Sequence, residues 1–244
     1  MKILVWQWGR RGAGPRYAAE LAASLRRLAG VESVLSLSAQ SEILAGPTPP
    51  PCELPVLTYT GLGSFLLRLP LTPFQIGPLA ARLCAFAPDL AICAMPAALD
   101  LLMAKALERA GIPMMVVVHD ADVHPGDGFP MQMTLQRLLV RRARGLIALT
   151  AEVGRRLHAQ DLVGDRPLIM TSLPPLTFGP RPPHRATMTD RFACSPSAAC
   201  CHIRVSICWP GRCGGWGRGR IWSCAWLARA LRVLRWQPCA SCLG

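Results

Sequence analysis

A short apolar run in the middle of the chain constrains its fold more than any other feature. Met114–Val118 contains only Met and Val and follows a Pro, a pattern typical of a strand buried on both faces of a parallel sheet. The run ends at His119 and Asp120, and a loop with Gly and Pro comes next. Because ligands of open α/β sheets bind just beyond the carboxyl ends of the strands, this pair is a candidate for chemistry. A polar strand end, with Asp120 in a turn, is the alternative.

Strand patterns alternate with helix patterns along the first 180 residues. Strands are predicted at residues 2–6, 31–37, 54–59, 90–93, 114–118, 145–149 and 167–170. Helices are predicted at residues 16–28, 39–44, 61–69, 73–86, 97–110, 132–142 and 151–159. Such alternation forms right-handed βαβ units, so we expect an α/β fold with a doubly wound, Rossmann-like parallel sheet. The apolar face of residues 61–69 either joins the core, the commoner outcome, or contacts lipid headgroups.

A glycine-rich loop, QWGRRGAGP at residues 7–15, separates the first predicted strand from the first predicted helix. The unpaired N–H groups and the dipole of a helix N-terminus attract anions, so this loop is a candidate anion site. The spacing of Gly9, Gly12 and Gly14 does not match the dinucleotide fingerprint, which argues against NAD. The alternative is a turn that needs flexible residues, with the arginines of the loop in solvent.

The composition of the chain changes abruptly near residue 185. The net charge of +13 would ordinarily indicate a nucleic acid or an anionic membrane surface, but no Asp or Glu follows Asp190, so the average misleads. Of the 11 Cys, all except Cys52, Cys84 and Cys93 lie at or after residue 194. We expect no nucleic-acid partner. No apolar run is long enough to span a membrane, and the N-terminus has the pattern of a strand and not of a signal peptide, so we expect a cytoplasmic protein.

Three interpretations of this tail remain open. Zinc sites are one, but only Cys239 and Cys242 have a usable spacing, and a second pair at ribbon spacing is missing. An RNA-binding tail is the second, although its arginines and tryptophans follow no recognised stacking platform. Disulfides are disfavoured without an export signal. The third interpretation is that the tail is read out of frame.

The genetic code supports the out-of-frame interpretation. If each codon is read from its third base, with C or G there, the residues from Phe192 onward become approximately LRLLxFGRLLPYKGLDLLA, and residues 221–231 become LVLRVAGAGA. Trp has a single codon, so Trp209 followed by Pro210 forces Ala, and Trp216 followed by Gly217 forces Gly. We therefore hypothesise a frameshift between about Gly179 and Met188 that truncates the protein. Sequencing of the locus tests this hypothesis.

Three stretches of the chain resemble the N-terminal half of a GT-B glycosyltransferase of family 4. They are MKILVWQWGRRGAGPRYAAELAASL, FAPDLAICAMPAALDLLMAKALERAGIPMMVVVHDADVHPGD and LVRRARGLIALTAEVGRRL. The out-of-frame peptides resemble the opening of the donor domain of that family, FGRLxPYKGxDLL, and its later VAGxG strand. The resemblance implies a GT-B N-terminal, acceptor-side domain over residues 1–180, followed by an irregular or disordered tail over residues 181–244.

The resemblance also implies a mechanism. In this family a second Rossmann-like domain binds the nucleotide sugar, and the sugar passes to an acceptor hydroxyl in the cleft without a catalytic metal. We therefore expect no cofactor, and as partners a nucleotide sugar and a carbohydrate or lipid-linked acceptor, with association at the inner face of a membrane. Gly12 and Gly14 match the loop that holds the donor diphosphate, and Arg10 and Arg16 are candidate contacts of the phosphate or the acceptor.

The strand end supplies the candidate catalytic residues. His119 matches the family position that faces the cleft, where a neutral imidazole can hydrogen-bond the sugar or assist proton transfer. Asp120 and Asp122 are expected to orient His119 or to bind acceptor hydroxyls, and His124 and Asp127 to shape the loop.

One departure from the family bears on activity. The paired glutamates of the family's donor domain have no counterpart, because no carboxylate follows Asp190. We therefore expect this chain to be inactive alone. Two other classes stay open: a GT-B sugar-nucleotide epimerase, and a lone Rossmann-like module that binds an anionic ligand.

Overall fold

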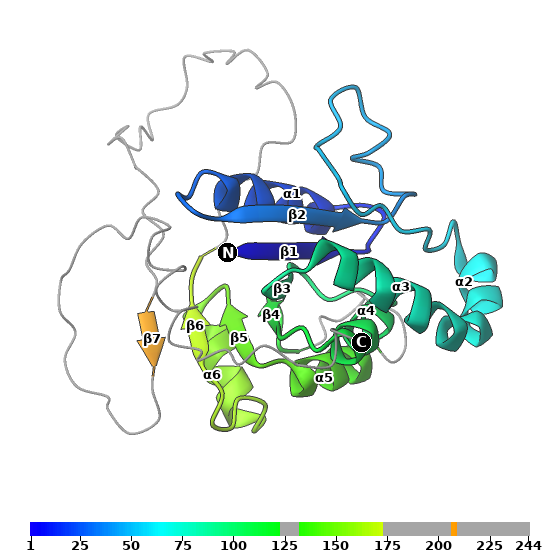
Figure 1. Cartoon of the computed structure of the whole chain (residues 1–244). Coiled ribbons are helices and arrows are strands. Elements are labelled where there is room, and N and C mark those ends of the chain that lie inside the picture. The colour runs from blue at the N-terminus through cyan, green and yellow to red at the C-terminus, as the bar shows by residue number, and fades with distance from the viewer. Residues whose placement is uncertain (123–131, 173–205, 209–244) are drawn as a thin grey trace, which may run out of the picture.

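The computed structural model describes residues 1–122, 132–172 and 206–208 (Figure 1). Within these residues, strands alternate with helices along the chain. The parallel strands are β1 (Lys2–Gln7), β2 (Glu32–Leu37), β3 (Leu90–Cys93), β4 (Met114–Val118), β5 (Gly145–Ala148) and β6 (Leu168–Met170). They are arranged in the order β2-β1-β3-β4-β5-β6, which confirms the prediction of a doubly wound parallel sheet.

A short strand in the tail extends this sheet. β7 (Ser206–Cys208) pairs antiparallel with β6, so Ile207 lies opposite Ile169. These three residues belong to the segment that the sequence predicts to be irregular. The remaining tail lies outside the described residues, and so do the proposed zinc ligands at residues 239 and 242. The domain boundary at residue 180 and the frameshift therefore stay predictions.

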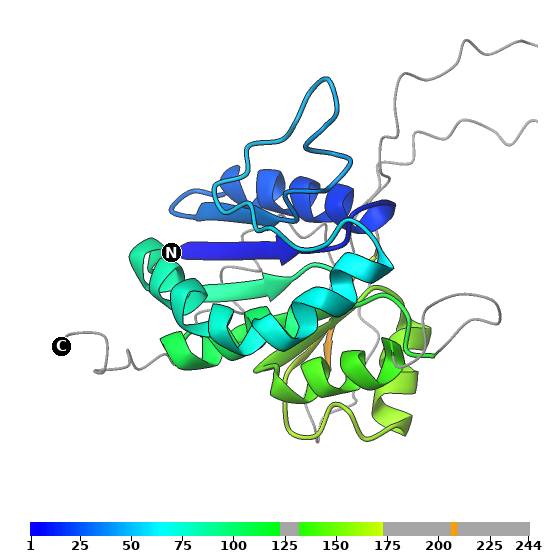
Figure 2. The same cartoon turned by 90° about the vertical axis from the view of Figure 1, so that its right-hand side faces the viewer.

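The helices cover both faces of the sheet (Figures 1 and 2). They are α1 (Ala13–Arg26), α2 (Leu62–Arg68), the 3-10 helix η1 (Leu69–Leu71), α3 (Thr72–Phe86), α4 (Asp100–Ala110), α5 (Gln132–Arg142) and α6 (Ala151–Ala159). α1 packs on one face, and α3, α4, α5 and α6 pack on the other. Helix α1 begins three residues earlier than predicted and α4 begins three residues later.

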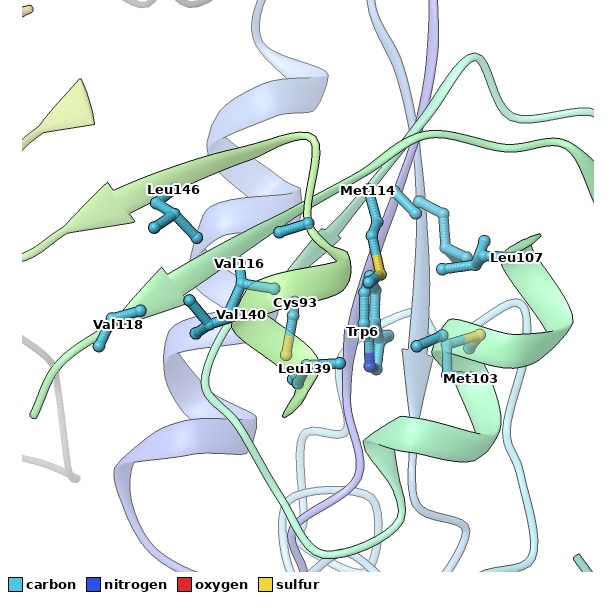
Figure 3. Packing of buried hydrophobic residues seen from close by; sticks show 14 of the residues in the cluster. Trp6, Cys93, Met103, Leu107, Met114, Val116, Val118, Leu139, Val140 and Leu146 are labelled. Carbon is cyan, nitrogen blue, oxygen red and sulfur yellow. The ribbon is translucent and has the colours of Figure 1, made fainter. Parts of the chain in front are cut away.

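Strand β4 is buried on both faces, as its apolar run predicts. All five of its residues are buried. Met115 and Val117 join the cluster under α1, whereas Met114, Val116 and Val118 join the opposite cluster, because successive side chains of a strand point to opposite faces. Figure 3 shows the second cluster, in which this strand lies among side chains from β1, β3, α4 and α5.

The segment after β2 differs from the prediction. Residues 39–44, predicted as a helix, form turns, in which the N–H of Leu44 donates to the carbonyl of Ser41. Residues 54–59, predicted as a strand, contribute only an isolated parallel bridge between Ser38 and Val56. Both predictions are therefore wrong in the type of structure, although the segment does run beside the edge of the sheet.

Local side-chain hydrogen bonds explain this difference. The Ser38 hydroxyl accepts from the N–H of Gln40 at 3.2 Å, and the Gln40 amide oxygen accepts from the N–H of Thr58 at 2.9 Å. The hydroxyls of Ser38 and Thr58 lie 2.6 Å apart. Polar side chains that bond to nearby backbone groups compete with helix and ladder formation.

Arg166 joins the ends of α5 and α6, which gives a first prediction. Its guanidinium donates to the carbonyls of Val140 at 2.6 Å, Ala143 at 3.3 Å and Val163 at 3.0 Å, and also to that of Leu162. Arg166→Met is expected to lower the free energy of unfolding by about 2 kcal/mol, because these carbonyls lose a charged donor. Urea denaturation measures this loss. Arg141→Met, at an exposed position on α5, is the control, and an equal effect of both variants would contradict the assignment.

Candidate functional site

A pocket lies where the strand order reverses. β1 pairs with β2 on one side and with β3 on the other, so chain segments leave their carboxyl ends in opposite directions. Ligands of doubly wound sheets bind at such a switch point. The pocket has a volume of about 220 Å³. Its wall consists of residues that follow β1 and β3, residues of α4 and α5, and one tyrosine: Gln7, Gly9, Tyr59, Pro96, Ala97, Ala98, Asp100, Leu101, Gln132, Leu135, Gln136 and Leu139.

Asp100, in this pocket wall, is a buried carboxyl at the start of α4. It is 1% exposed. Its Oδ1 accepts from Trp6 Nε1 at 3.2 Å, and its Oδ2 accepts from the N–H of Ala97 at 2.6 Å and from Cys93 Sγ at 3.3 Å. Burial raises the pKa of Asp100 to about 7, although these three hydrogen bonds lower it. The pocket therefore contains a carboxyl that titrates near neutral pH.

Sequence reasoning missed Asp100. An acidic residue in the first turn of a helix is ordinarily a surface residue that interacts with the helix dipole. Here the ring N–H comes from Trp6, 94 residues away, and the thiol from Cys93. The only local signal is that an acidic residue follows the end of a buried strand in a parallel sheet, as Asp120 does.

Gln7 explains two glycines of the loop after β1. Its side chain is buried, and its Oε1 accepts from the N–H of Gly9 at 2.9 Å. A Cβ on Gly9 or on Gly14 would lie 2.6 Å from Gln7 Nε2. A side chain at either position would therefore displace the end of the Gln7 side chain from beneath the loop.

Gly12 has a different constraint. It precedes α1 with a φ of 87°, a backbone conformation that favours glycine. Its N–H donates to Glu42 Oε1 at 3.1 Å, and the N–H of Glu42 donates to the carbonyl of Arg10 at 2.9 Å. The N-terminus of α1, which is the predicted anion site, thus already holds a carboxylate of the chain itself.

The two candidate arginines lie outside the pocket wall. Arg10 donates through Nη1 to the carbonyl of Thr60, and its Nε has no hydrogen-bond partner within the described residues. Arg16 is half-buried in the first turn of α1. Arg10 lies within the glycine loop and joins it to the segment that leads to α2, whereas Arg16 follows the loop.

His119 and Asp120 form a pair at the end of β4. Their Nε2 and Oδ2 atoms lie 3.2 Å apart, and their side chains are 36% and 40% exposed. His119 Nδ1 is buried and has no hydrogen-bond partner among the described residues. The pair does not line the pocket, but Gln136 Nε2, in the pocket wall, donates to the carbonyl of Asp120 at 2.6 Å. One hydrogen bond thus links the candidate catalytic pair to that wall.

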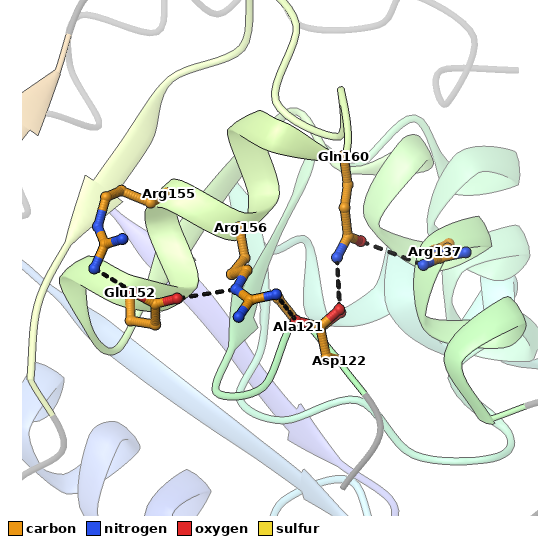
Figure 4. A network of polar contacts seen from close by, with 7 residues as sticks. All are labelled: Ala121, Asp122, Arg137, Glu152, Arg155, Arg156 and Gln160. Atoms are coloured by element: carbon orange, nitrogen blue, oxygen red, sulfur yellow. Dashed lines mark hydrogen bonds and ion pairs between the residues drawn. The ribbon is translucent and has the colours of Figure 1, made fainter.

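Asp122 is bound to α6 and not to His119 (Figure 4). Its Oδ2 lies 3.2 Å from Arg156 Nη1, and its Oδ1 accepts from Gln160 Nε2 at 2.9 Å. Arg156 also pairs with Glu152 at 2.9 Å. This network fastens the end of β4 to α6. His124 and Asp127 lie outside the described residues.

Neither a metal centre nor a membrane-spanning helix is found in the described part of the chain. No group of three or more His, Cys, Asp or Glu side chains there is arranged to hold a metal ion. No helix there has the length and the apolar character needed to cross a bilayer.

Comparison with known families identifies the fold family. Residues 12–171 match the model of the glycosyl transferase 4-like domain. The chain belongs to this family. The match begins within the glycine loop and ends after β6, so it includes the His119–Asp120 pair, the network on α6 and all residues of the pocket wall except Gln7 and Gly9. A search of the curated proteins finds no match.

Solved structures confirm the fold of this glycosyl transferase 4-like chain. A structure of S. aureus MnaA with UDP is 16% identical, with a TM-score of 0.52, over 70% of this chain and 43% of that one. A UDP-N-acetylglucosamine 2-epimerase is 14% identical, with a TM-score of 0.53, over 70% and 48%. The UDP-GlcNAc 2-epimerase of Neisseria meningitidis, bound to UDP-GlcNAc, is 16% identical, with a TM-score of 0.52, over 66% and 43%. The chain thus spans less than half the length of these proteins.

Proposed function

We propose that this chain is the acceptor-side domain of a glycosyltransferase, which transfers a sugar from a nucleotide-sugar donor to an acceptor hydroxyl. The observation that carries the proposal is the pocket at the β1–β3 switch point within a glycosyl transferase 4-like domain. Amide, carboxyl and phenol groups of Gln7, Asp100, Gln136 and Tyr59 border it. Such groups suit a hydroxyl-rich acceptor.

His119 is the proposed catalytic residue. A neutral imidazole with its proton on Nε2 donates to Asp120 Oδ2 and leaves Nδ1 as an acceptor for a hydroxyl proton. Nδ1 has no partner among the described residues, which supports this role, because a buried polar atom without a hydrogen bond is costly unless a ligand or a water supplies one. We propose that this chemistry needs no metal or cofactor.

The glycine loop is the proposed contact of the donor diphosphate, with Gly12, Gly14, Arg10 and Arg16. A diphosphate there must replace the carboxylate of Glu42. Glu42→Ala is therefore expected to raise the affinity of the chain for UDP about threefold to fivefold, because the helix N-terminus becomes free for an anion. Isothermal titration calorimetry measures this change.

Glu20→Ala is the matched control for this experiment. It removes the same charge from an exposed position on α1 that lies away from the helix N-terminus. If the two variants gain affinity equally, net charge explains the effect and the loop does not hold the diphosphate.

We also propose that the chain alone does not transfer sugar. No carboxylate follows Asp190, so residues 191–244 cannot supply the paired glutamates of the family's donor domain. A panel of sugar nucleotides, with release of nucleotide as the readout, is expected to give no signal above the blank. Turnover by the purified chain would contradict this proposal. DNA sequencing of the locus that confirms the reading frame of the given sequence would reject the frameshift.

A protein in which the proposed frameshift is corrected, which we call the frame-restored protein, distinguishes the competing functions. A glycosyltransferase releases nucleotide only when an acceptor is present, whereas an epimerase isomerises its donor without an acceptor. A lone binding module would show a thermal shift with the acceptor and none with the nucleotide. We place the proposed enzyme at the cytoplasmic face of a membrane, where a lipid-linked acceptor would be available.

A further inference from the structure

The exposed large apolar side chains of the described residues are concentrated in one region. Six of the nine lie on α2, on η1 and at the start of α3: Leu62, Leu66, Leu67, Leu69, Leu71 and Phe74. Their exposed fractions range from 42% to 79%. We call this region the α2 surface. The sequence allowed this helix to join the core or to contact lipid; Phe65 packs against the core, but no residue of α2 is buried.

The side chains of the α2 surface do not hold α2 in place. Phe65 attaches α2 to the rest of the molecule through an edge contact with Tyr59, whose ring centroid lies 5.3 Å away. Ser64 accepts from the N–H groups of Thr60 and Gly61, which fixes the start of the helix. The exposed leucines of α2 neither attach the helix to the rest of the molecule nor fix its start. Contiguous exposed apolar side chains mark an interaction surface.

The charge around the α2 surface has a single sign. No Asp or Glu occurs between Glu53 and Asp89, whereas Arg82 is exposed and Arg68 is half-buried. Arg68 lies between two leucines of the surface, and its Nη1 donates to the carbonyl of Leu57 at 3.2 Å. An apolar surface with basic and without acidic side chains is complementary to anionic lipid headgroups.

The α2 surface adjoins the pocket. Tyr59 lines the pocket and also contacts Phe65 of α2. Figure 1 places α2 at the margin of the molecule, on the side toward which β1 runs. A flat partner on the α2 surface would therefore lie beside the opening that the proposed acceptor uses.

We propose that the α2 surface docks the protein onto an anionic lipid bilayer, with the leucines and Phe74 in the headgroup region and the pocket facing the membrane. The idea that a lipid-linked acceptor is thereby presented rests on the proposed function. The docking itself does not, because it depends only on exposed apolar area and charge.

Sedimentation with lipid vesicles tests the docking. The whole chain is expected to bind vesicles of phosphatidylcholine with phosphatidylglycerol more tightly than vesicles of phosphatidylcholine alone. The triple variant Leu62→Ser, Leu67→Ser, Phe74→Ser replaces the three most exposed side chains and is expected to lose at least about tenfold in affinity. Arg68→Ser is expected to weaken binding to the anionic vesicles only.

Leu138→Ser, at an exposed leucine of α5, is the matched control and is expected to bind as the unchanged chain does. Thermal unfolding checks that each variant folds. No vesicle binding by the unchanged chain, or equal binding by the triple variant, overturns the proposal. The proposal is also overturned if sedimentation velocity shows a dimer for the unchanged chain and a monomer for the triple variant, because a second copy would then cover the α2 surface. Each of these failures leaves the UDP titration of Glu42→Ala unaffected, so docking and proposed function are tested separately.

Discussion

Asp100→Asn is expected to remove most of the loss of stability that the chain undergoes between acidic and neutral pH. Asp100 is buried, and burial raises its pKa from 3.8 to about 7. The folded state therefore holds this proton more tightly than the unfolded state does. Between these two pKa values the unfolded chain releases the proton and the folded chain retains it, so the free energy of unfolding falls as pH rises.

The size of the effect follows from the shift. A difference of about three pKa units corresponds to about 4 kcal/mol, reached when the pH rises above the folded pKa. Asn has no charge to bury, but one amide cannot replace a carboxylate that accepts from Trp6, Ala97 and Cys93. The variant is therefore expected to be less stable than the unchanged protein near pH 4 and more stable near pH 8.

Urea denaturation at a series of pH values measures this crossing. The quantity to follow is the difference in free energy of unfolding between variant and unchanged protein, because other groups titrate in both and cancel. Asp165→Asn, which removes an exposed carboxyl, is the matched control. A difference for Asp100→Asn that stays constant between about pH 4 and pH 8 would show that the carboxyl does not keep its proton in the folded state.

The parts of the fold that the sequence predicts are those with a clear hydrophobic pattern. Met114–Val118, a continuous apolar run after a Pro, favours a strand buried on both faces, and the structure confirms it. The turn segment at residues 39–44 has no such pattern. Its structure depends on a side-chain oxygen of Gln40 that bonds to Thr58, a partner that pattern reasoning cannot supply.

The candidate site divides in the same way. His119 and Asp120 are adjacent in sequence, so their pairing follows from the strand end itself. Asp122 is two residues farther, yet its partners are on α6, which approaches only through tertiary packing. The sequence predicts that Gly14 contacts a ligand. The structure shows a second reason for a small residue there, because the side chain of Gln7 lies beneath it. Contacts between residues distant in the chain are those that the sequence does not reveal.

His119→Asn is expected to lower kcat of the frame-restored protein by about 100-fold to 10,000-fold, the range for loss of a general acid or base. Asn keeps a donor that can reach Asp120 but has no ring nitrogen in the place of Nδ1. The loss should therefore appear in kcat and not in KM, because the group acts on the proton that moves in the transition state. Steady-state kinetics with varied acceptor measures both constants.

Two further variants decide whether the imidazole itself acts. His158→Asn, on α6, is the control and is expected to leave kcat unchanged, because this side chain lies in the last turn of a helix that does not border the pocket. Asp120→Asn replaces the acceptor of the Nε2 proton with a neutral amide. Without that carboxylate the ring is no longer held with its proton on Nε2, so kcat is expected to fall. A full kcat in both His119→Asn and Asp120→Asn would give the pair a structural role only, and proton transfer would then belong to another group.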